Sequence, residues 1–284
     1  ELFLNAEGIE QYLSGVILFS ETFNQKGSDK KLFTNSLSAR GIAPGIKVDE
    51  GTEPFPESPN ELLTKGLIGL SERLADFKSR GAVFTKWRAV VTIEGDNLPS
   101  SAATLENAKR LAAYAKQAQE AGLVPILEPE VLLAGLHSRA RARDVLGETL
   151  RTLFSVLEEQ VVDRSGVILK TAMALSGSEN ARKDTPEEVA LDTVEVLLET
   201  VPRDVAGIVF LSGGQTPDQA TENLAAVCAR ARSASAPWPL TFSYARALQE
   251  EALMAWRGDE ENLEVARQVY LARLSKVSLA TLPH

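Results

Sequence analysis

Short apolar runs recur along the whole chain, and longer amphipathic stretches separate them. This alternation is the feature that most constrains the fold. The runs are nearly continuous in Val, Ile, Leu and Phe, which is typical of strands buried on both faces of a sheet. We predict strands within residues 15–19, 45–49, 83–93, 123–130, 166–173, 206–214 and 240–245.

The stretches between these runs carry signals for helix starts and stops. Thr185 is an N-cap candidate followed by proline at the first helical position and by two acids, and Thr216 begins a similar Thr-Pro-Asp sequence. An alanine-rich stretch ends at Gly122, a residue type that favours helix termination. We predict helices at 71–81, 101–122, 146–162, from 186 onward, at 219–232, 247–256 and 262–280. The stretch 49–60 is the most loop-like part of the chain.

Strand–helix alternation throughout the chain requires parallel strand pairing with right-handed crossovers. Two architectures satisfy it, an open doubly wound sheet and a closed (β/α)₈ TIM barrel. No GxGxxG or GxxxxGK[ST] pattern follows a strand, which argues against the nucleotide-binding open sheets. Polar residues instead crowd the ends of many strands, as in barrel enzymes. We predict an α/β TIM barrel in a single domain over residues 1–284, with one of its eight strands missing.

Composition excludes several classes of function. The 284 residues include 30 Lys and Arg against 39 Asp and Glu, and the formal charge of −9 argues against a non-specific nucleic-acid or membrane-surface binder. No apolar run approaches the roughly 20 residues that span a bilayer. A single cysteine and two histidines leave neither a disulfide nor an imidazole-based zinc site. We therefore expect no metal and no cofactor.

Lys170 ends the apolar run GVILK. A lysine at the buried end of a strand loses solvation, which lowers its pKa and frees the amine to attack a carbonyl carbon. The alternative interpretation is a surface lysine at the point where the strand emerges. Lys170 alone does not decide between them.

Two pairs of charged residues have the i, i+2 spacing that places both side chains on one face of a strand. Lys86 and Arg88 flank Trp87, which would point into the helix layer, and Glu128 and Glu130 form the second pair. Two cations on an inner barrel face require an anion, either a substrate phosphate or a carboxylate, and paired carboxylates can move protons. The alternative is a structural layer of ion pairs.

Lys47 adds a third lysine at a predicted strand end, in GIKVDEG, where it shares a face with Asp49. A barrel interior does not tolerate several unpaired ammonium groups. A purely structural role is therefore harder to defend for Lys47, Lys86 and Lys170 together at strand ends than for any one of these lysines.

The last two predicted strands each precede a loop suited to an anion. Ser212, Gly213 and Gly214 come before a helix cap, and such glycines let backbone amides approach an anion. Ser243 and Arg246 follow the next strand and open a helix. Barrels recurrently bind phosphate in the loops after the seventh and eighth strands. Here the loops follow the sixth and seventh visible strands, so we expect the missing strand to be the first. The alternative for SGG is a tight turn.

Other notable residues have structural interpretations. We expect four residues of the polar stretch LHSRARAR to face solvent: His137, Arg139, Arg141 and Arg143. We expect three more to be buried packing residues: Cys228, Trp238 and Trp256.

The motifs GIKVDEG, KWR, EPE, GVILK, FLSGGQ and FSYARALQ occur in this order, each at a strand end. Their sequence and spacing resemble the class I fructose-1,6-bisphosphate aldolases over nearly the whole chain, from about residue 15 to 280. The resemblance implies a (β/α)₈ barrel that is usually a homotetramer. It also implies cleavage of fructose 1,6-bisphosphate to dihydroxyacetone phosphate and glyceraldehyde 3-phosphate through a lysine imine, without metal, in glycolysis and gluconeogenesis.

By this resemblance, Lys170 is the imine-forming lysine, Glu128 exchanges protons with the carbinolamine and hydroxyl groups, and Lys86 helps to keep Lys170 deprotonated. Glu130 is a carboxylate paired with these lysines. The residues that line the site or hold a phosphate are Lys47, Arg88, Ser212, Gly213, Gly214, Ser243, Ala245 and Arg246.

The chain also departs from the family. The family's first strand ends in an aspartate and is followed by serines and an arginine that grip the second phosphate, and residues 1–13 match none of it. The family's C-terminal tail, which ends in tyrosine, is likewise unmatched. We therefore expect a chain trimmed at both ends, with two unpaired sheet edges.

The resemblance leaves two alternatives open. One is another imine-forming barrel lyase or transferase, similar to transaldolase. The other is a non-catalytic scaffold with the aldolase fold. As partners we expect a phosphorylated sugar and further copies of the chain, with neither nucleic acid nor membrane, in the cytoplasm or, after removal of a transit peptide, the plastid stroma.

Overall fold

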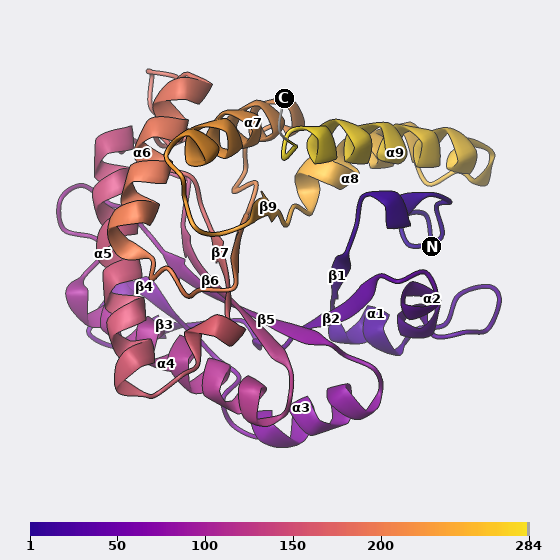
Figure 1. Cartoon of the computed structure of the whole chain (residues 1–284), viewed down its shortest axis with the longest axis horizontal. Coiled ribbons are helices and arrows are strands. Elements are labelled where there is room, and N and C mark those ends of the chain that lie inside the picture. The colour runs from indigo at the N-terminus through magenta and orange to yellow at the C-terminus, as the bar shows by residue number, and fades with distance from the viewer. Residues whose placement is uncertain (283–284) are drawn as a thin grey trace.

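Seven parallel strands form one curled sheet in the order β1-β2-β5-β6-β7-β8-β9 (Figure 1). This computed structural model describes residues 1–282. Each strand lies in or beside one of the predicted apolar runs, so the predicted strands are confirmed. Their bounds are β1 Gly15–Leu18, β2 Ala43–Lys47, β5 Phe84–Val91, β6 Val124–Val131, β7 Ile168–Thr171, β8 Gly207–Phe210 and β9 Leu240–Phe242.

Helices connect successive strands and cover the outside of the curl (Figure 1). Thr185 and Thr216 cap their helices as predicted, and Glu188 completes a capping box with Thr185. The helices are α1 Ser20–Asn24, α2 Phe33–Ala39, α3 Leu70–Ser79, α4 Ser101–Glu120, α5 Arg139–Glu159, α6 Pro186–Thr200, α7 Pro217–Ser233, α8 Arg246–Trp256 and α9 Leu263–Leu279. Three short 3₁₀ turns lie at Ile9–Gln11, Arg164–Gly166 and Glu260–Asn262.

The curled sheet has the arrangement of a TIM barrel, but no strand pairing joins β1 to β9 within residues 1–282. In Figure 1, α8, α9 and the segment before β1 lie on the side of the sheet where its edge strands β1 and β9 are. Phe3 and Tyr270 of α9 meet edge to face there, with ring centroids 4.9 Å apart. Packing between the two ends of the chain therefore occupies the region next to the open edges.

The stretch 49–60 is not a loop, so that prediction is wrong. Its residues contribute to an antiparallel hairpin of β3 (Thr52–Phe55) and β4 (Ser58–Thr64). Phe55 and Leu63 form a small second apolar cluster with Ala103 of α4. Pro54 sits beside a register shift and does not prevent the pairing. This tertiary packing outweighs the turn-forming composition that suggested a loop.

The alternation along β5 separates the core from the site. Trp87 is fully buried on the outer face and stacks on Tyr114 of α4, with ring centroids 5.4 Å apart. Lys86 and Arg88 therefore point to the inner face, as their spacing predicts. Cys228 and Trp238 are buried as expected, whereas Trp256 is only partly buried against the core. No helix within residues 1–282 combines the length and the apolarity that a membrane span needs.

Candidate active site

Charged side chains from adjacent strands meet inside the curl of the sheet. The Nζ atom of Lys86, on β5, lies 2.9 Å from Oε2 of Glu128 on β6. The Nζ atom of Lys170, on β7, lies 3.0 Å from Oε1 of the same carboxylate. Because the three strands are neighbours in the sheet, residues far apart in sequence converge on one carboxylate. The structure thus brings together the predicted nucleophile, proton-transfer group and neighbouring lysine.

All three side chains are buried, with exposed fractions of 9% for Lys170, 7% for Lys86 and 4% for Glu128. Burial lowers the pKa of Lys170, opposed by the carboxylate of Glu128 and assisted by the ammonium group of Lys86. Burial alone would raise the pKa of Glu128, but the ammonium groups of Lys170 and Lys86 hold it below its ordinary value. The cluster therefore favours a carboxylate beside an amine that loses its proton more easily than a solvated lysine.

Asp49 extends this cluster toward β2. Its Oδ1 atom lies 2.5 Å from Nζ of Lys47, and its Oδ2 atom lies 3.8 Å from Nζ of Lys86. The backbone N–H of Arg88 donates to Oδ2 at 3.2 Å. Asp49 was absent from the predicted site residues, although its i, i+2 spacing from Lys47 was a usable signal. The result is a row of alternating charges, Lys47, Asp49, Lys86, Glu128 and Lys170.

Arg88 and Glu130 form a second ion pair, on the same face of β5 and β6 as Lys86 and Glu128. The Arg88 side chain is 40% exposed, whereas that of Glu130 is 10% exposed. Glu130 therefore pairs with Arg88 through its side chain rather than directly with a lysine. Its negative charge nevertheless contributes to the pKa of Lys170.

The glycine-rich loop after β8 lies beside the end of the Lys170 strand, because the N–H of Leu211 donates to the carbonyl of Thr171. Gly213 and Gly214 have φ values of 59° and 96°, which glycine adopts without strain. Ser212 is buried, with an exposed fraction of 7%. The loop can therefore turn sharply and present backbone amides next to the lysine cluster.

The segment after β9 completes this side of the site. The N–H of Ser243 donates to the carbonyl of Phe210 on β8, which places the two loops side by side. Ala245 is the N-cap residue of α8, and its side chain cannot accept a hydrogen bond from the first backbone N–H groups of the helix. Arg246 is exposed and makes no ion pair with residues 1–282. Free amides and a free guanidinium suit an anion.

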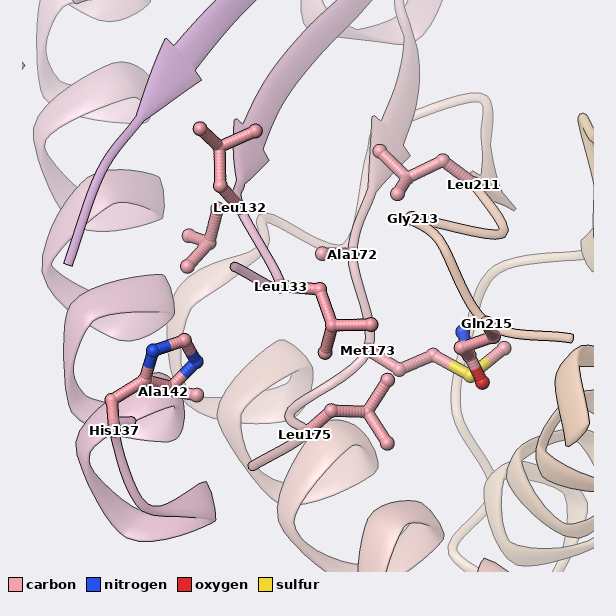
Figure 2. Close-up of a pocket in the computed structure, with 11 residues that line it drawn as sticks. Leu132, Leu133, His137, Ala142, Ala172, Met173, Leu175, Leu211, Gly213 and Gln215 are labelled. Atoms are coloured by element: carbon pink, nitrogen blue, oxygen red, sulfur yellow. The ribbon is translucent and has the colours of Figure 1, made fainter. Parts of the chain in front are cut away.

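His137 is half-buried, so the prediction that it is solvated is wrong. It lines a small cavity of about 10 Å³ behind the ends of β6, β7 and β8, with mostly apolar neighbours such as Leu133 and Leu175 (Figure 2). Burial lowers its pKa, and Nδ1 has no hydrogen-bond partner within residues 1–282. The polar neighbours in sequence gave no sign of this packing.

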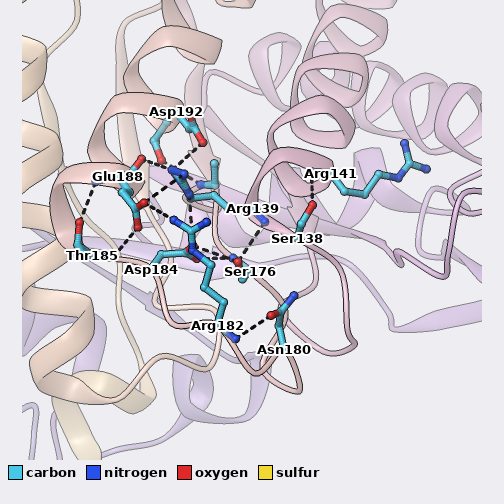
Figure 3. Close-up of polar contacts among 12 residues, drawn as sticks. Ser138, Arg139, Arg141, Ser176, Asn180, Arg182, Asp184, Thr185, Glu188 and Asp192 are labelled. Atoms are coloured by element: carbon cyan, nitrogen blue, oxygen red, sulfur yellow. Dashed lines mark hydrogen bonds and ion pairs between the residues drawn. The ribbon is translucent and has the colours of Figure 1, made fainter.

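The three arginines after His137 are not a free solvent-facing surface either. Figure 3 shows Arg139 among acidic residues at the start of α6, with ion pairs of 3.3 Å to Asp184 and 2.9 Å to Asp192. Arg143 pairs with Glu199 at 2.7 Å, and Arg141 donates to the Leu98 carbonyl. The α5 helix also starts at Arg139, seven residues before the prediction. These arginines bind carboxylates and a carbonyl on other elements, and the local sequence pattern does not indicate such partners.

No group of three or more His, Cys, Asp or Glu side chains that could hold a metal ion occurs in residues 1–282. His284, the second histidine counted in the sequence, lies outside the described residues. The charges that this site offers to a substrate come from its lysine, arginine and carboxylate side chains.

Comparisons with known proteins agree with this geometry. The family model described as fructose-bisphosphate aldolase class-I matches residues 1–284. The chain is 45% identical over 283 residues to a probable fructose-bisphosphate aldolase class 1 of Xanthomonas axonopodis pv. citri, covering 99% of this chain and 84% of the relative. It is 46% identical over 282 residues to the cytoplasmic isozyme of Spinacia oleracea, covering 99% and 78%.

Among solved structures, fructose-bisphosphate aldolase from Plasmodium falciparum, in complex with TRAP and a small-molecule inhibitor, matches with a TM-score of 0.95. Sequence identity is 41%, and the match covers 99% of this chain and 80% of that chain. Sequence and fold agree over almost the whole of the chain. This protein belongs to the class I fructose-bisphosphate aldolase family.

Proposed function

We propose that this chain cleaves fructose 1,6-bisphosphate reversibly to dihydroxyacetone phosphate and glyceraldehyde 3-phosphate, through an imine on Lys170. The observation that carries the proposal is the pair of lysines on the two oxygens of one buried carboxylate. This arrangement supplies an amine with a lowered pKa and, within 3.0 Å of it, a group that can accept and return protons.

In this reaction the neutral amine of Lys170 attacks the C2 carbonyl, and water leaves to form an iminium ion. The C3–C4 bond then breaks, and its electron pair moves into the iminium to give an enamine. The C4 hydroxyl proton leaves to a base as the aldehyde forms. Glu128 lies where it can exchange protons with the carbinolamine and the hydroxyl groups, and Lys86 disfavours a second positive charge on Lys170. A proton then adds to C3 of the enamine, and addition of water to the resulting iminium ion releases dihydroxyacetone phosphate and the free lysine.

The phosphate of the half that stays bound to Lys170 would lie in the two loops after β8 and β9. Its proposed ligands are the backbone and side chains of Ser212, Gly213, Gly214, Ser243, Ala245 and Arg246. Lys47 and Arg88 are proposed to line the remainder of the site. Because the chain carries a formal charge of −9, local cations must attract the anionic substrate against the net charge.

The setting of the reaction is part of this proposal. We propose a single catalytic domain that acts in glycolysis and gluconeogenesis and assembles into a homo-oligomer, a tetramer by resemblance to the family. Relatives include a cytosolic and a chloroplastic aldolase of Arabidopsis thaliana, which supports either the cytoplasm or the plastid stroma.

The test is borohydride trapping with dihydroxyacetone phosphate, followed by mass spectrometry of the labelled peptide. We expect one adduct per chain, on Lys170, and the same adduct in the control variant Lys109→Ala, which alters an exposed lysine of α4. Label on Lys47 or Lys86 would overturn the assigned roles. Label on Lys170 without cleavage of fructose 1,6-bisphosphate would favour a transaldolase-like enzyme, and neither label nor cleavage would favour a scaffold.

A further inference from the structure

The two loops proposed to hold the phosphate belong to different strands, yet buried polar contacts tie both to one helix, α7. The loop after β8 is held through Gln215. Its side-chain Nε2 donates to the carbonyl of Ser212 at 3.0 Å, and its Oε1 accepts from Nδ2 of Asn223 on α7 at 2.7 Å. Gln215 and Asn223 have exposed fractions of 7% and 2%. The backbone N–H of Gln215 donates to the same carbonyl at 2.9 Å, so Gln215 holds the Ser212 carbonyl with two hydrogen bonds.

The segment after β9 is held through Tyr244. This residue follows Ser243 and precedes Ala245 and Arg246 in the chain. Its buried hydroxyl donates to the carbonyl of Ala220, in the first turns of α7, at 2.9 Å. The exposed fraction of Tyr244 is 8%. The flanking residues can therefore face the site while the tyrosine anchors the segment on the opposite side.

A third contact fixes α8, the helix that begins with Arg246. The guanidinium of Arg273 on α9 is buried and binds both carboxylate oxygens of Glu251 on α8 at 2.7 Å. It also donates to Asp218 in the first turn of α7 at 3.0 Å. Thus α8 is bound to the same end of α7 that holds the two loops.

We propose that α7 is the frame that sets the spacing of the phosphate pocket, with Gln215, Asn223 and Tyr244 as positioning residues. None of these side chains needs to touch the phosphate. They act by holding the two loops at one separation, so that backbone amides and the Arg246 guanidinium converge on one anion. The inference rests on the proposed function and adds to it the residues that determine affinity for the phosphate group.

The geometry of phosphate binding explains why the two loops need such a frame. A phosphate bound by several donors binds more weakly when the donors move apart. Small displacements also matter for rate, since a shift of about 1 Å caused by a distant residue can lower an enzyme's rate up to about a hundredfold. The two loops are held to each other through short strands, β8 of four residues and β9 of three. Loops at the ends of such short strands need further support, and α7 supplies it to both.

The test compares two tyrosine variants in borohydride trapping. Tyr244→Phe removes only the hydroxyl that binds α7. Tyr270→Phe is the matched control, because Tyr270 is also buried but its hydroxyl makes no hydrogen bond to residues 1–282. Burial is the cause that raises the pKa of Tyr270 to about 12. Gln215→Met removes the other connection with little change in volume. Each variant is titrated with dihydroxyacetone phosphate and, separately, with phosphate-free dihydroxyacetone.

We expect Tyr244→Phe and Gln215→Met each to raise the concentration of dihydroxyacetone phosphate that gives half-maximal trapping by about two- to tenfold. Trapping of dihydroxyacetone on Lys170 should be unchanged, and Tyr270→Phe should match the unaltered protein with both compounds. Binding of inorganic phosphate, measured by calorimetry, should weaken by the same factor in the two variants.

Two results would overturn the frame. One is an unchanged response of Tyr244→Phe and Gln215→Met to dihydroxyacetone phosphate. The other is an equal loss with dihydroxyacetone, which would place the effect on Lys170 or on folding. The proposed function fails differently: in that case the unaltered protein forms no adduct on Lys170 with either compound, and the frame is overturned with it.

Discussion

The lysine cluster on β5, β6 and β7 and the loops after β8 and β9 lie side by side, but their charges are organised differently. In the cluster, each cation already has a protein anion, as Lys86 and Lys170 share Glu128. In the loops, Arg246 is exposed without an ion pair to residues 1–282, and Ala245 leaves the start of α8 uncapped. In one region each cation contacts a protein carboxylate, and in the other the donors have no protein partner within residues 1–282.

Under the proposed function, this difference assigns the chemistry to the cluster and the phosphate binding to the loops. Buried charges must be paired to be tolerated, and their mutual interactions shift pKa values toward proton transfer. Donors at a surface can stay unpaired because water solvates them until an anion arrives. Substitutions in the cluster should therefore change catalysis and folding together, whereas substitutions in the loops should change affinity alone.

The largest effect should come from Glu128→Gln. This change removes the carboxylate between two buried lysines, so we expect kcat to fall about 10²- to 10⁴-fold. We also expect the free energy of unfolding to fall by about 3–5 kcal/mol, because the ammonium groups lose their partner. Steady-state kinetics and urea denaturation measure the two losses, with Glu120→Gln, at the exposed end of α4, as the control. A fall in kcat without destabilisation would break the proposed coupling.

Arg246→Ala should have an intermediate effect confined to binding. Loss of a charge-assisted hydrogen bond, worth about 1.5–3 kcal/mol, should weaken substrate binding roughly ten- to a hundredfold. Stability should change by no more than about 0.5 kcal/mol, since the side chain is exposed. Apparent affinities for fructose 1,6-bisphosphate and fructose 1-phosphate are compared with those of the exposed control Arg203→Ala. Unchanged affinity for both substrates would remove Arg246 from the site.

A third effect, measured as a shift of the pH profile, should follow from Lys86→Met. The amine of Lys170 must be neutral to attack, so imine formation should rise with pH as it passes through the lowered pKa of Lys170. Lys86→Met removes the repulsion between the Lys86 and Lys170 ammonium groups. It also leaves Lys170 as the only lysine paired with Glu128, and both changes raise the pKa of Lys170. The acid limb of the trapping rate should move to higher pH. A shift to lower pH would contradict the assignment.

The smallest effect, within error of zero, should come from chelators. Both regions are proposed to act through side chains and backbone donors, and covalent catalysis by an amine needs no Lewis acid. Cleavage activity should be the same before and after dialysis against EDTA. Loss of activity that zinc restores would show that a metal supplies charge which we assign to the lysines.

Much of this architecture could be predicted from local pattern. Strand periodicity placed Lys86 and Arg88 on one face and Trp87 on the other, because alternate side chains of a strand point to opposite sides. Proline and threonine at 185–186 and 216–217 predicted two helix starts correctly. The candidate site residues stand out in the sequence because each is a polar residue in or after an apolar run, although Lys86 and Glu128 lie within β5 and β6 rather than at their ends.

Other features could not be predicted locally. The β3–β4 hairpin depends on Phe55 and Leu63 packing against α4, a contact that turn-rich composition conceals. His137 and Arg139 are withdrawn from solvent by partners on the segment after β7 and on α6. In both cases the deciding neighbour is remote in sequence, so periodicity and composition carry no information about it.

The sequence by itself determined which residue types end each strand and which face they occupy, since these follow from backbone geometry that every strand shares. Only the tertiary structure decided the partners. The curl and the strand order placed Glu128 between Lys86 and Lys170, and put Asp49 between Lys47 and Lys86. The physical reason is that interactions between charges depend on distances of a few ångströms, and those distances arise only when the sheet has formed.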